Sequence, residues 1–342
     1  MQERLKQELP QILQALQILS PTSFSWAGTT ISVGDLQHEP PPDLDEQKNL
    51  LIEHLVRQLY HQCYCRKFKA DLIYQPVVPE PNEDFVNALS EANTTVKRLD
   101  PGWHVLRRLP TEYYLVQKSD SIRAVGPDEL ISHDGPGVDL REGIAVNVLC
   151  RKESKTMHPG FYYIFGATLT DQRDEDDLLR FYWNIKAEAV QSLVRLLTNR
   201  LNRFQIPFRL KCLNNPASYN RADAAVLYLN SRFYRLATEL LAEVHEQVED
   251  YLDPDAPLFS KQLAAGLGLA EEPGDGESFG QQRCRILAEG IWNAYELNLH
   301  AGHERLREVI NKFELKGLSL DHPHLNPGSI DQYDFPVRRV TV

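Results

Sequence analysis

The clearest pattern of apolar and polar positions lies between residues 178 and 229, where segments of two periods alternate. Leu178–Ile185 is rich in aromatic and branched side chains and is short enough for a strand. The segment after it carries apolar side chains at steps of three and four, which predicts a helix with one face on a core. That stripe consists of Val190, Leu193, Val194, Leu197, Leu201 and Phe204.

Two more strands are predicted after Pro207, which ends the helical region. Residues 208–213 return to a period of two. One side of this strand carries Phe208, Leu210 and Cys212, and the other carries Arg209, Lys211 and Leu213. Ala224–Leu229 is an almost uninterrupted apolar run, typical of a strand covered on both faces. The region therefore predicts a strand, a helix and two strands in succession.

The flanking segments extend this picture in both directions. Residues 2–19 and 45–66 predict helices, and between them SFSWAGTTISVGD and the HEPPPD turn cannot continue a helix. Aromatic and branched runs broken by turn residues at 103–126 and 139–169 predict hairpins of an antiparallel sheet. Later helices are predicted at 186–204, 231–252, 279–298 and 304–313.

The alternation of periods predicts an α+β fold with an antiparallel or mixed central sheet, built from residues 103 to 230 and flanked by long helices, and a helical N-terminal portion. The proline-rich stretch at 76–81 is the natural boundary. We expect a helical subdomain over 1–80 and an α+β core over 81–342, with one continuous domain as the alternative.

Composition excludes several functional classes. The 342 residues are 42% hydrophobic and 25% charged, which is ordinary for a globular protein, and the formal net charge of -11 argues against nucleic-acid or anionic-membrane partners. No run approaches about 18 apolar residues, so no membrane span is expected. The N-terminal stretch mixes charged and apolar positions and predicts an amphipathic helix rather than a signal peptide.

The five cysteines predict neither disulfides nor a metal centre. Only Cys63 and Cys65 are close in sequence, and a structural zinc site would need a second such pair. We interpret all five as reduced thiols of a cytoplasmic protein. His303, His322 and His324 are expected at the surface, and no metal or other cofactor is expected.

Polar side chains cluster at the ends of the apolar elements and predict an anion site, because a cation at the rim of a low-dielectric cleft attracts anions strongly. The candidates are Arg180, Asn184, Lys186, Lys211, Tyr219 and Arg221. Lys211 is the most telling, since an ammonium on an apolar strand is costly to bury alone. Structural readings stay open for the others: ion pairs of Arg180 with Asp176 or Asp177 and of Arg221 with Asp223, a helix cap at Asn184, a solvated Lys186 and a packed Tyr219.

A second candidate site is the run from Gly266 to Gly290. Ser278 is placed to cap a helix that begins near residue 279, and Arg283 and Arg285 lie in its first two turns, where at most one faces a site. Three acids, Glu271, Glu272 and Asp275, would repel phosphate, so we interpret the loop as a lid over a cationic peptide. The glycine spacing fits neither nucleotide-binding fingerprint.

Several long motifs resemble the HopA-type family, which is named for type III secretion effectors. They are FYWNI at 181–185, IPFRLKCLNNPASYNRADAAVLYL at 206–229, the run 266–290 and LNPGS at 325–329, with weaker likeness in LYHQCYCR at 59–66 and HPGFYYIFG at 158–166. Bacterial relatives occur as domains in the machinery that makes lanthipeptides and thioamide-containing peptides. The resemblance to these members implies a lyase that removes phosphate from phosphoserine or phosphothreonine and leaves a dehydroamino acid. The implied partners are a phosphorylated precursor peptide and, as a further candidate, its kinase.

Such a lyase needs a base, cations for the phosphate and an acid for the bridging oxygen. We expect Lys211 as base, with Tyr219 or His158 as acid. The phosphate clamp would comprise Arg180, Arg221 and one of Arg283 or Arg285. This division of labour resembles that of bacterial phosphothreonine lyases, but their Lys-x-His signature is absent, since KTMH at 155–158 has two intervening residues. The alternative is a non-catalytic, effector-type protein that binds a peptide.

Overall fold

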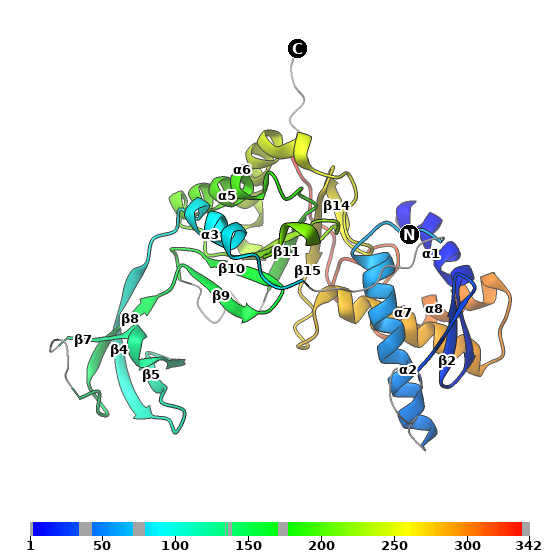
Figure 1. The fold of residues 1–342 in the computed structure, drawn as a ribbon, viewed down its shortest axis with the longest axis horizontal. Helices are drawn as coiled ribbons and strands as arrows, with labels where there is room; N and C mark the ends of the chain where they lie inside the picture. Colours follow the sequence, from blue (N-terminus) through cyan, green and yellow to red (C-terminus); the bar gives the residue numbers. More distant parts are fainter. Residues whose placement is uncertain are drawn as a thin grey trace, which may run out of the picture.

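The computed structural model describes residues 3–33, 43–70, 79–133, 135, 139–169 and 177–336. Within them the chain forms three antiparallel sheets together with α-helices, which confirms the predicted α+β class and its N-terminal helix. Figure 1 shows a small sheet at one end, a large sheet in the middle and a group of helices with a third sheet at the other end.

The central sheet has seven strands, all paired antiparallel with their neighbours. In spatial order they are β14 (Lys261–Ala264), β15 (Leu267–Glu271), β11 (Leu178–Trp183), β13 (Ala225–Asn230), β12 (Arg209–Leu213), β10 (Phe161–Phe165) and β9 (Glu153–His158). β11 and β12 are consecutive in the sequence but not adjacent in the sheet, because β13 lies between them. The strand, helix and two strands predicted at 178–229 are therefore confirmed.

One face of the central sheet is apolar and lies under α3 (Glu83–Ala92), α5 (Val190–Arg203) and α6 (Tyr234–Val248) (Figure 1). The predicted apolar side of β12, with Leu210 and Cys212, packs into this core. The helical stripe of α5 meets it there, and Leu193 and Leu197 are fully buried. Burial of these side chains is the main stabilisation of this half of the molecule.

The other face of the sheet is covered at one side by a group of four helices. They are α1 (Glu3–Ala15), α2 (Leu44–Leu59), α7 (Phe279–Glu296) and α8 (Gly302–Leu315). A π-helical turn, Tyr60–Tyr64, continues α2 onto the sheet, where the rings of Tyr64 and Tyr182 meet edge to face at 6.4 Å. This second core includes side chains from both ends of the chain, such as Leu55 and Phe313.

The small sheet lies beyond β9 and has its own core. Its strands, in spatial order, are β6 (Ser121–Val125), β5 (Tyr114–Lys118), β4 (Arg98–Arg108), β8 (Ala145–Cys150) and β7 (Leu130–Ser132). Trp103, Val116 and Val146 are buried within it. The predicted hairpins at 103–126 and 139–169 are therefore confirmed, but they are divided between two sheets rather than one.

The N-terminal portion is not wholly helical. Residues 16–32, where a helix end and a linker are predicted, form a third sheet of β1 (Leu16–Ser20), β2 (Ser23–Trp26) and β3 (Thr29–Ser32). Phe24 and Trp26 alternate with serines and are buried, and the two-residue turn uses positive φ at Ala27 (50°) and Gly28 (82°). The alternation in SFSW was the available signal for a strand.

The prediction of a loop over 266–278, interpreted as a lid, is wrong in its first part. Residues 267–271 form β15, an interior strand of the central sheet, and all five are buried. The predicted helix cap is confirmed, since the Ser278 hydroxyl caps α7 by accepting from the backbone N–H of Gln281.

The proline-rich stretch at 76–81 lies partly outside the described residues, and the domain division at residue 80 stays a prediction. Among the described helices, none is both long and apolar enough to cross a bilayer.

The contact between α7 and the π-helical turn gives a test of the packing. A Cβ on Gly280 would lie 2.4 Å from Cε1 of Tyr64, so Gly280→Ala should overpack this contact and lower the free energy of unfolding by about 1–3 kcal/mol. Gly302→Ala is the control, because nothing lies within 4 Å of its Cβ position. Urea unfolding should separate the two variants; equal stabilities would contradict the described packing.

Candidate anion-binding site

The second face of the central sheet carries a row of cations around Tyr228. Arg180 on β11 and Arg209 on β12 are the direct cross-strand neighbours of Tyr228 on β13. Their guanidinium carbons lie 5.1 Å and 4.8 Å from the centre of its ring. The ring quadrupole attracts both charges, so this one residue holds two arginines on adjacent strands close together.

Lys211 lies one position further along the same face of β12 and joins this row to a second group. Its Nζ is 5.6 Å from the Tyr228 ring centre and 4.5 Å from the centre of Phe161 on β10. The Arg221 guanidinium approaches the same Phe161 ring at 6.0 Å, and the His158 ring meets it edge to face at 5.2 Å. We call Arg180, Arg209, Lys211, Arg221 and His158 the basic cluster.

The cluster holds more cations than counterions. Arg180 is only 7% exposed and forms a bidentate pair with Glu272, which replaces the predicted pairing with Asp177; Asp176 lies outside the described residues. Neither the Arg209 side chain nor the Lys211 side chain forms a hydrogen bond or an ion pair with any residue that the structure describes. These two cations are therefore available to an anion.

Arg221 is paired, as one structural reading of the sequence anticipated. Its Nε and one terminal nitrogen donate to the two oxygens of Asp223 at 2.6 Å and 2.7 Å, and the Tyr60 hydroxyl donates to the same carboxylate at 3.1 Å. Burial alone would raise the pKa of Asp223, but the Arg221 guanidinium lowers it to about 2. The pair fixes the position of Arg221 at the end of the cluster.

His158 stands at the edge of the cluster as a neutral donor. Its Nδ1 accepts the backbone N–H of Gly160 at 3.1 Å, which leaves Nε2 as the protonated nitrogen. Partial burial and the positive charges of Lys211 and Arg221 lower the pKa of His158 below its ordinary value. Among neighbouring rings, burial and Arg221 lower the pKa of His61 to about 4.

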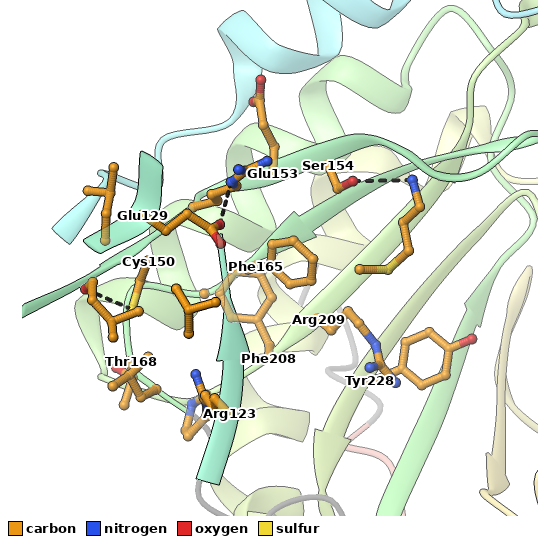
Figure 2. A pocket seen from close by; sticks show the side chains of 18 of the residues that line it. Arg123, Glu129, Cys150, Glu153, Ser154, Phe165, Thr168, Phe208, Arg209 and Tyr228 are labelled. Atoms are coloured by element: carbon orange, nitrogen blue, oxygen red, sulfur yellow. Dashed lines mark hydrogen bonds and ion pairs between the residues drawn. The ribbon is translucent and has the colours of Figure 1, made fainter. Parts of the chain in front are cut away.

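A cavity of about 470 Å³ begins beside the cluster and runs between the central sheet and the small sheet. Arg209 and Tyr228 line one side, with the Arg209 guanidinium against the tyrosine ring, as Figure 2 shows. Across from them lie Arg123 and Cys150 of the small sheet, and Phe165 and Phe208 line the apolar part. Its volume lies within the range of ligand-binding cavities, and the charged side chains of Arg123, Glu129 and Glu153 line it as well as Arg209.

Two residues predicted for the site have other partners, and a third, Lys186, is exposed elsewhere. The Tyr219 hydroxyl donates to the backbone oxygen of Leu213 at 2.8 Å, and its ring packs on Phe85. The Asn184 amide donates to the backbone oxygen of Asp255 at 2.8 Å, and Lys186 is exposed beyond the far end of β11. Their described contacts do not bring these side chains to Lys211.

Arg283 and Arg285 also lie in other surroundings. Arg283 is fully buried and donates to the backbone oxygens of Pro323 and Leu325, each at 2.8 Å, and burial lowers its pKa to about 10. Arg285 pairs with Glu53 and Glu277. The described contacts therefore give Arg283 a part in holding residues 323–325 and give Arg285 surface ion pairs.

The sequence reasoning missed Arg209 and the aromatic rings that gather the cations. Arg209 shares its strand face with Lys211 at a spacing of two, which was visible in the pattern. Tyr228 and Phe161 were interpreted as strand and core residues, and their closeness to Lys211 depends on the order of β10, β12 and β13.

Two features concern thiols and metal ligands. All five cysteines are free; Cys63, Cys65, Cys212 and Cys284 are buried, and burial raises the pKa of each of these four thiols.

His324, expected at the surface, is only 1% exposed. With His322 and Asp331 it forms the group of side chains that could hold a metal ion in the described part of the chain.

Comparison with known proteins gives the family. Searching the curated proteins returns no match. Two solved effector proteins resemble the chain: that of Pseudomonas syringae pv. tomato strain DC3000 at 16% identity and a TM-score of 0.44, and that of pv. syringae strain 61 at 13% and 0.43. In each case the match covers 80% of this chain and 95% of the other. The family model of the HopA1 effector proteins matches residues 152–325, and these include the central-sheet strands that carry the basic cluster. The chain therefore belongs to the HopA1 effector protein family.

Proposed function

We propose that this protein is a lyase that eliminates phosphate from phosphoserine or phosphothreonine in a precursor peptide. The observation that carries the proposal is a pair of cations, Arg209 and Lys211, that form no ion pair with the described residues and lie on the sheet face beside a cavity. The chain as a whole has a net charge of -11, so a local excess of cations calls for a specific anion. A phosphorylated side chain supplies that charge and several acceptor oxygens.

The proposed reaction assigns a role to each group. Lys211 as free amine takes the α-proton, and the electron pair of the Cα–H bond forms the Cα–Cβ double bond. The bond between Cβ and the bridging oxygen breaks, and its electron pair leaves with the phosphate. His158 gives a proton to that oxygen from its protonated form, which is the minor form near neutrality because burial and the neighbouring cations lower its pKa. The products are a dehydroamino acid, hydrogen phosphate, a Lys211 ammonium and neutral His158, so protons and electrons balance.

The arginines act on the charge that the leaving group develops. Arg209 flanks Lys211 on the Tyr228 ring and presents a planar guanidinium group that suits phosphate oxygens, whereas Arg221, on the Phe161 ring, is already bound to Asp223 and adds positive potential. Arg180 is already bound to Glu272, so it adds positive potential but does not offer a free guanidinium to the phosphate. In this assignment the acid is His158 and not Tyr219, because the Tyr219 hydroxyl is engaged by Leu213.

The cavity between the two sheets supports a peptide substrate. It continues from Arg209 and Tyr228 along apolar side chains, so a peptide lying in it would present one phosphorylated side chain to the cluster. The partners that follow are the precursor peptide and a kinase that phosphorylates it beforehand. A protein that bound the phosphopeptide without chemistry would use the same contacts, and the first experiment below distinguishes the two.

Replacing Lys211 separates the reaction from binding. Lys211→Met removes the base but only one of several cations, so elimination should fall by on the order of 10²–10⁴ while phosphopeptide affinity falls less than about tenfold. Loss of phosphoric acid from a phosphothreonine peptide, followed by mass spectrometry, measures the reaction. Lys97→Met, which changes an exposed lysine, is the control. Wild-type protein that binds the peptide without any mass loss would favour the non-catalytic reading.

Replacing Arg209 tests the phosphate clamp. Arg209→Met keeps an apolar side chain against Tyr228 but removes a free guanidinium, so phosphopeptide affinity should fall about tenfold, the equivalent of about 1.4 kcal/mol. Affinity for the unphosphorylated peptide should not change. Equal losses for the two peptides would show that Arg209 contributes to the cavity wall and not to phosphate recognition.

The lowered pKa of His158 predicts a pH dependence of anion binding. His158 is uncharged near neutrality and gains a charge only below its ordinary titration range, so sulfate, which stays ionised throughout, should bind several-fold more tightly as the pH falls from about 8 to 5. Titration of sulfate by NMR measures this. In His158→Gln the affinity should be much less dependent on pH, and an unchanged profile in that variant would remove His158 from the site.

A further inference from the structure

Three potential metal ligands meet where the C-terminal segment crosses the edge of the central sheet. His322, His324 and Asp331 each offer one ligand atom, and these atoms all lie within 4.8 Å of one another. One oxygen of Asp331, Oδ2, lies 3.5 Å from Nδ1 of His322 and 3.5 Å from Nε2 of His324. The segment from residue 322 to 331 thus folds back so that two imidazoles face one carboxylate oxygen.

His324 is not satisfied by its surroundings. The side chain is buried, and neither ring nitrogen has a hydrogen-bond partner among the described residues. A separation of 3.5 Å is longer than an ordinary hydrogen bond to a carboxylate. Burying a polar group without a hydrogen bond is unfavourable, so this imidazole would gain from a ligand on the nitrogen that faces Asp331.

The spacing fits a metal ion at the centre. In a tetrahedral zinc site with bonds of about 2.0–2.1 Å, two ligand atoms lie about 3.4 Å apart. Both separations from Asp331 Oδ2 agree with that edge, and the ligand atoms of His322 and His324 lie within 4.8 Å of each other. We propose that His322, His324 and Asp331 bind a divalent transition-metal ion of the zinc type, with the fourth position open to water.

The residues around the cluster hold its ligands in place. Lys261 on β14 donates to Oδ1 of Asp331 at 2.7 Å, so Oδ2 is left for the ion. The backbone of the segment is held on both sides of His324, since Arg283 binds the carbonyls of Pro323 and Leu325. The Glu271 backbone N–H donates to the carbonyl oxygen of His324 itself. Such partners orient ligands before the metal arrives.

Imidazole and carboxylate together favour first-row metals over Ca²⁺ or Mg²⁺, which prefer sites made of oxygen atoms. The ion would fasten the segment 322–331 to β14 and β15, and the proposed elimination at Lys211 makes no use of it. The two proposals therefore stand or fail separately.

Binding of Co²⁺ to the chelator-treated protein tests the site. Wild-type protein should take up one equivalent and show the visible absorption bands of a tetrahedral ion, and Zn²⁺ should displace it and raise the thermal midpoint. His322→Ala and Asp331→Asn should each weaken binding by at least about tenfold, since even changes beyond the ligands cost about 10–100-fold.

His322 is exposed, so its alanine variant leaves the folded core intact, which the midpoint of the metal-free protein verifies. His303→Ala, an exposed histidine on α8, is the control and should bind like the wild type. Wild-type protein that takes up no ion, or the same affinity in wild type and both ligand variants, would overturn the proposal.

Discussion

The alternation of side chains along β12 is the constraint on which the rest of the structure depends. Leu210 and Cys212 point to the face under the helices, so Arg209 and Lys211 must point to the opposite face. A charged group on a sheet cannot be buried alone without a large cost. The structure meets this cost with the aromatic rings of Tyr228 and Phe161 and leaves that part of the face next to a cavity.

The polar face is closed beside the basic cluster by the segment that follows α2. The π-helical turn after α2 brings Tyr60 to the Arg221–Asp223 pair, and the backbone N–H of Ala222 donates to the Cys65 carbonyl at 2.6 Å. On the opposite face, under α6, Tyr333 donates to Glu271 at 2.6 Å, so the C-terminal segment is attached to β15. On the polar face the ion pairs Arg221–Asp223 and Arg180–Glu272 flank Arg209 and Lys211, which form no ion pair with the described residues. Preorganised cations of this kind are what an anion site requires.

Much of the fold could be predicted because its signals are local. The strand, helix and two strands at 178–229 follow from periods of two and 3.6 that need no knowledge of neighbours. The strand at 267–271 was mistaken for a lid because glycines and acids were interpreted as a loop, whereas Gly268 is required by close packing: its Cβ would lie 2.8 Å from that of Ala256.

The candidate site was predictable only in part. Lys211 stood out because its strand is apolar, and Arg180 and Arg221 were chosen with it; the structure places all three beside the same two rings, Tyr228 and Phe161. The counterion of Arg180 could not be foreseen, since Glu272 is distant in sequence and meets it through pairing of β11 with β15. The grouping of His322, His324 and Asp331 likewise depends on how the segment folds back.

If Lys211 and Arg209 form a phosphate site, a crystal of the protein soaked in tungstate, a heavy analogue of phosphate, will bind the ion there. Anomalous density is expected within hydrogen-bonding distance of Lys211 Nζ and of the Arg209 or Arg221 guanidinium. Density only at other cations would contradict this assignment, for example in the cavity that Arg285 and Lys316 line. A basic cluster without density, at tungstate concentrations that fill such sites, would also contradict it.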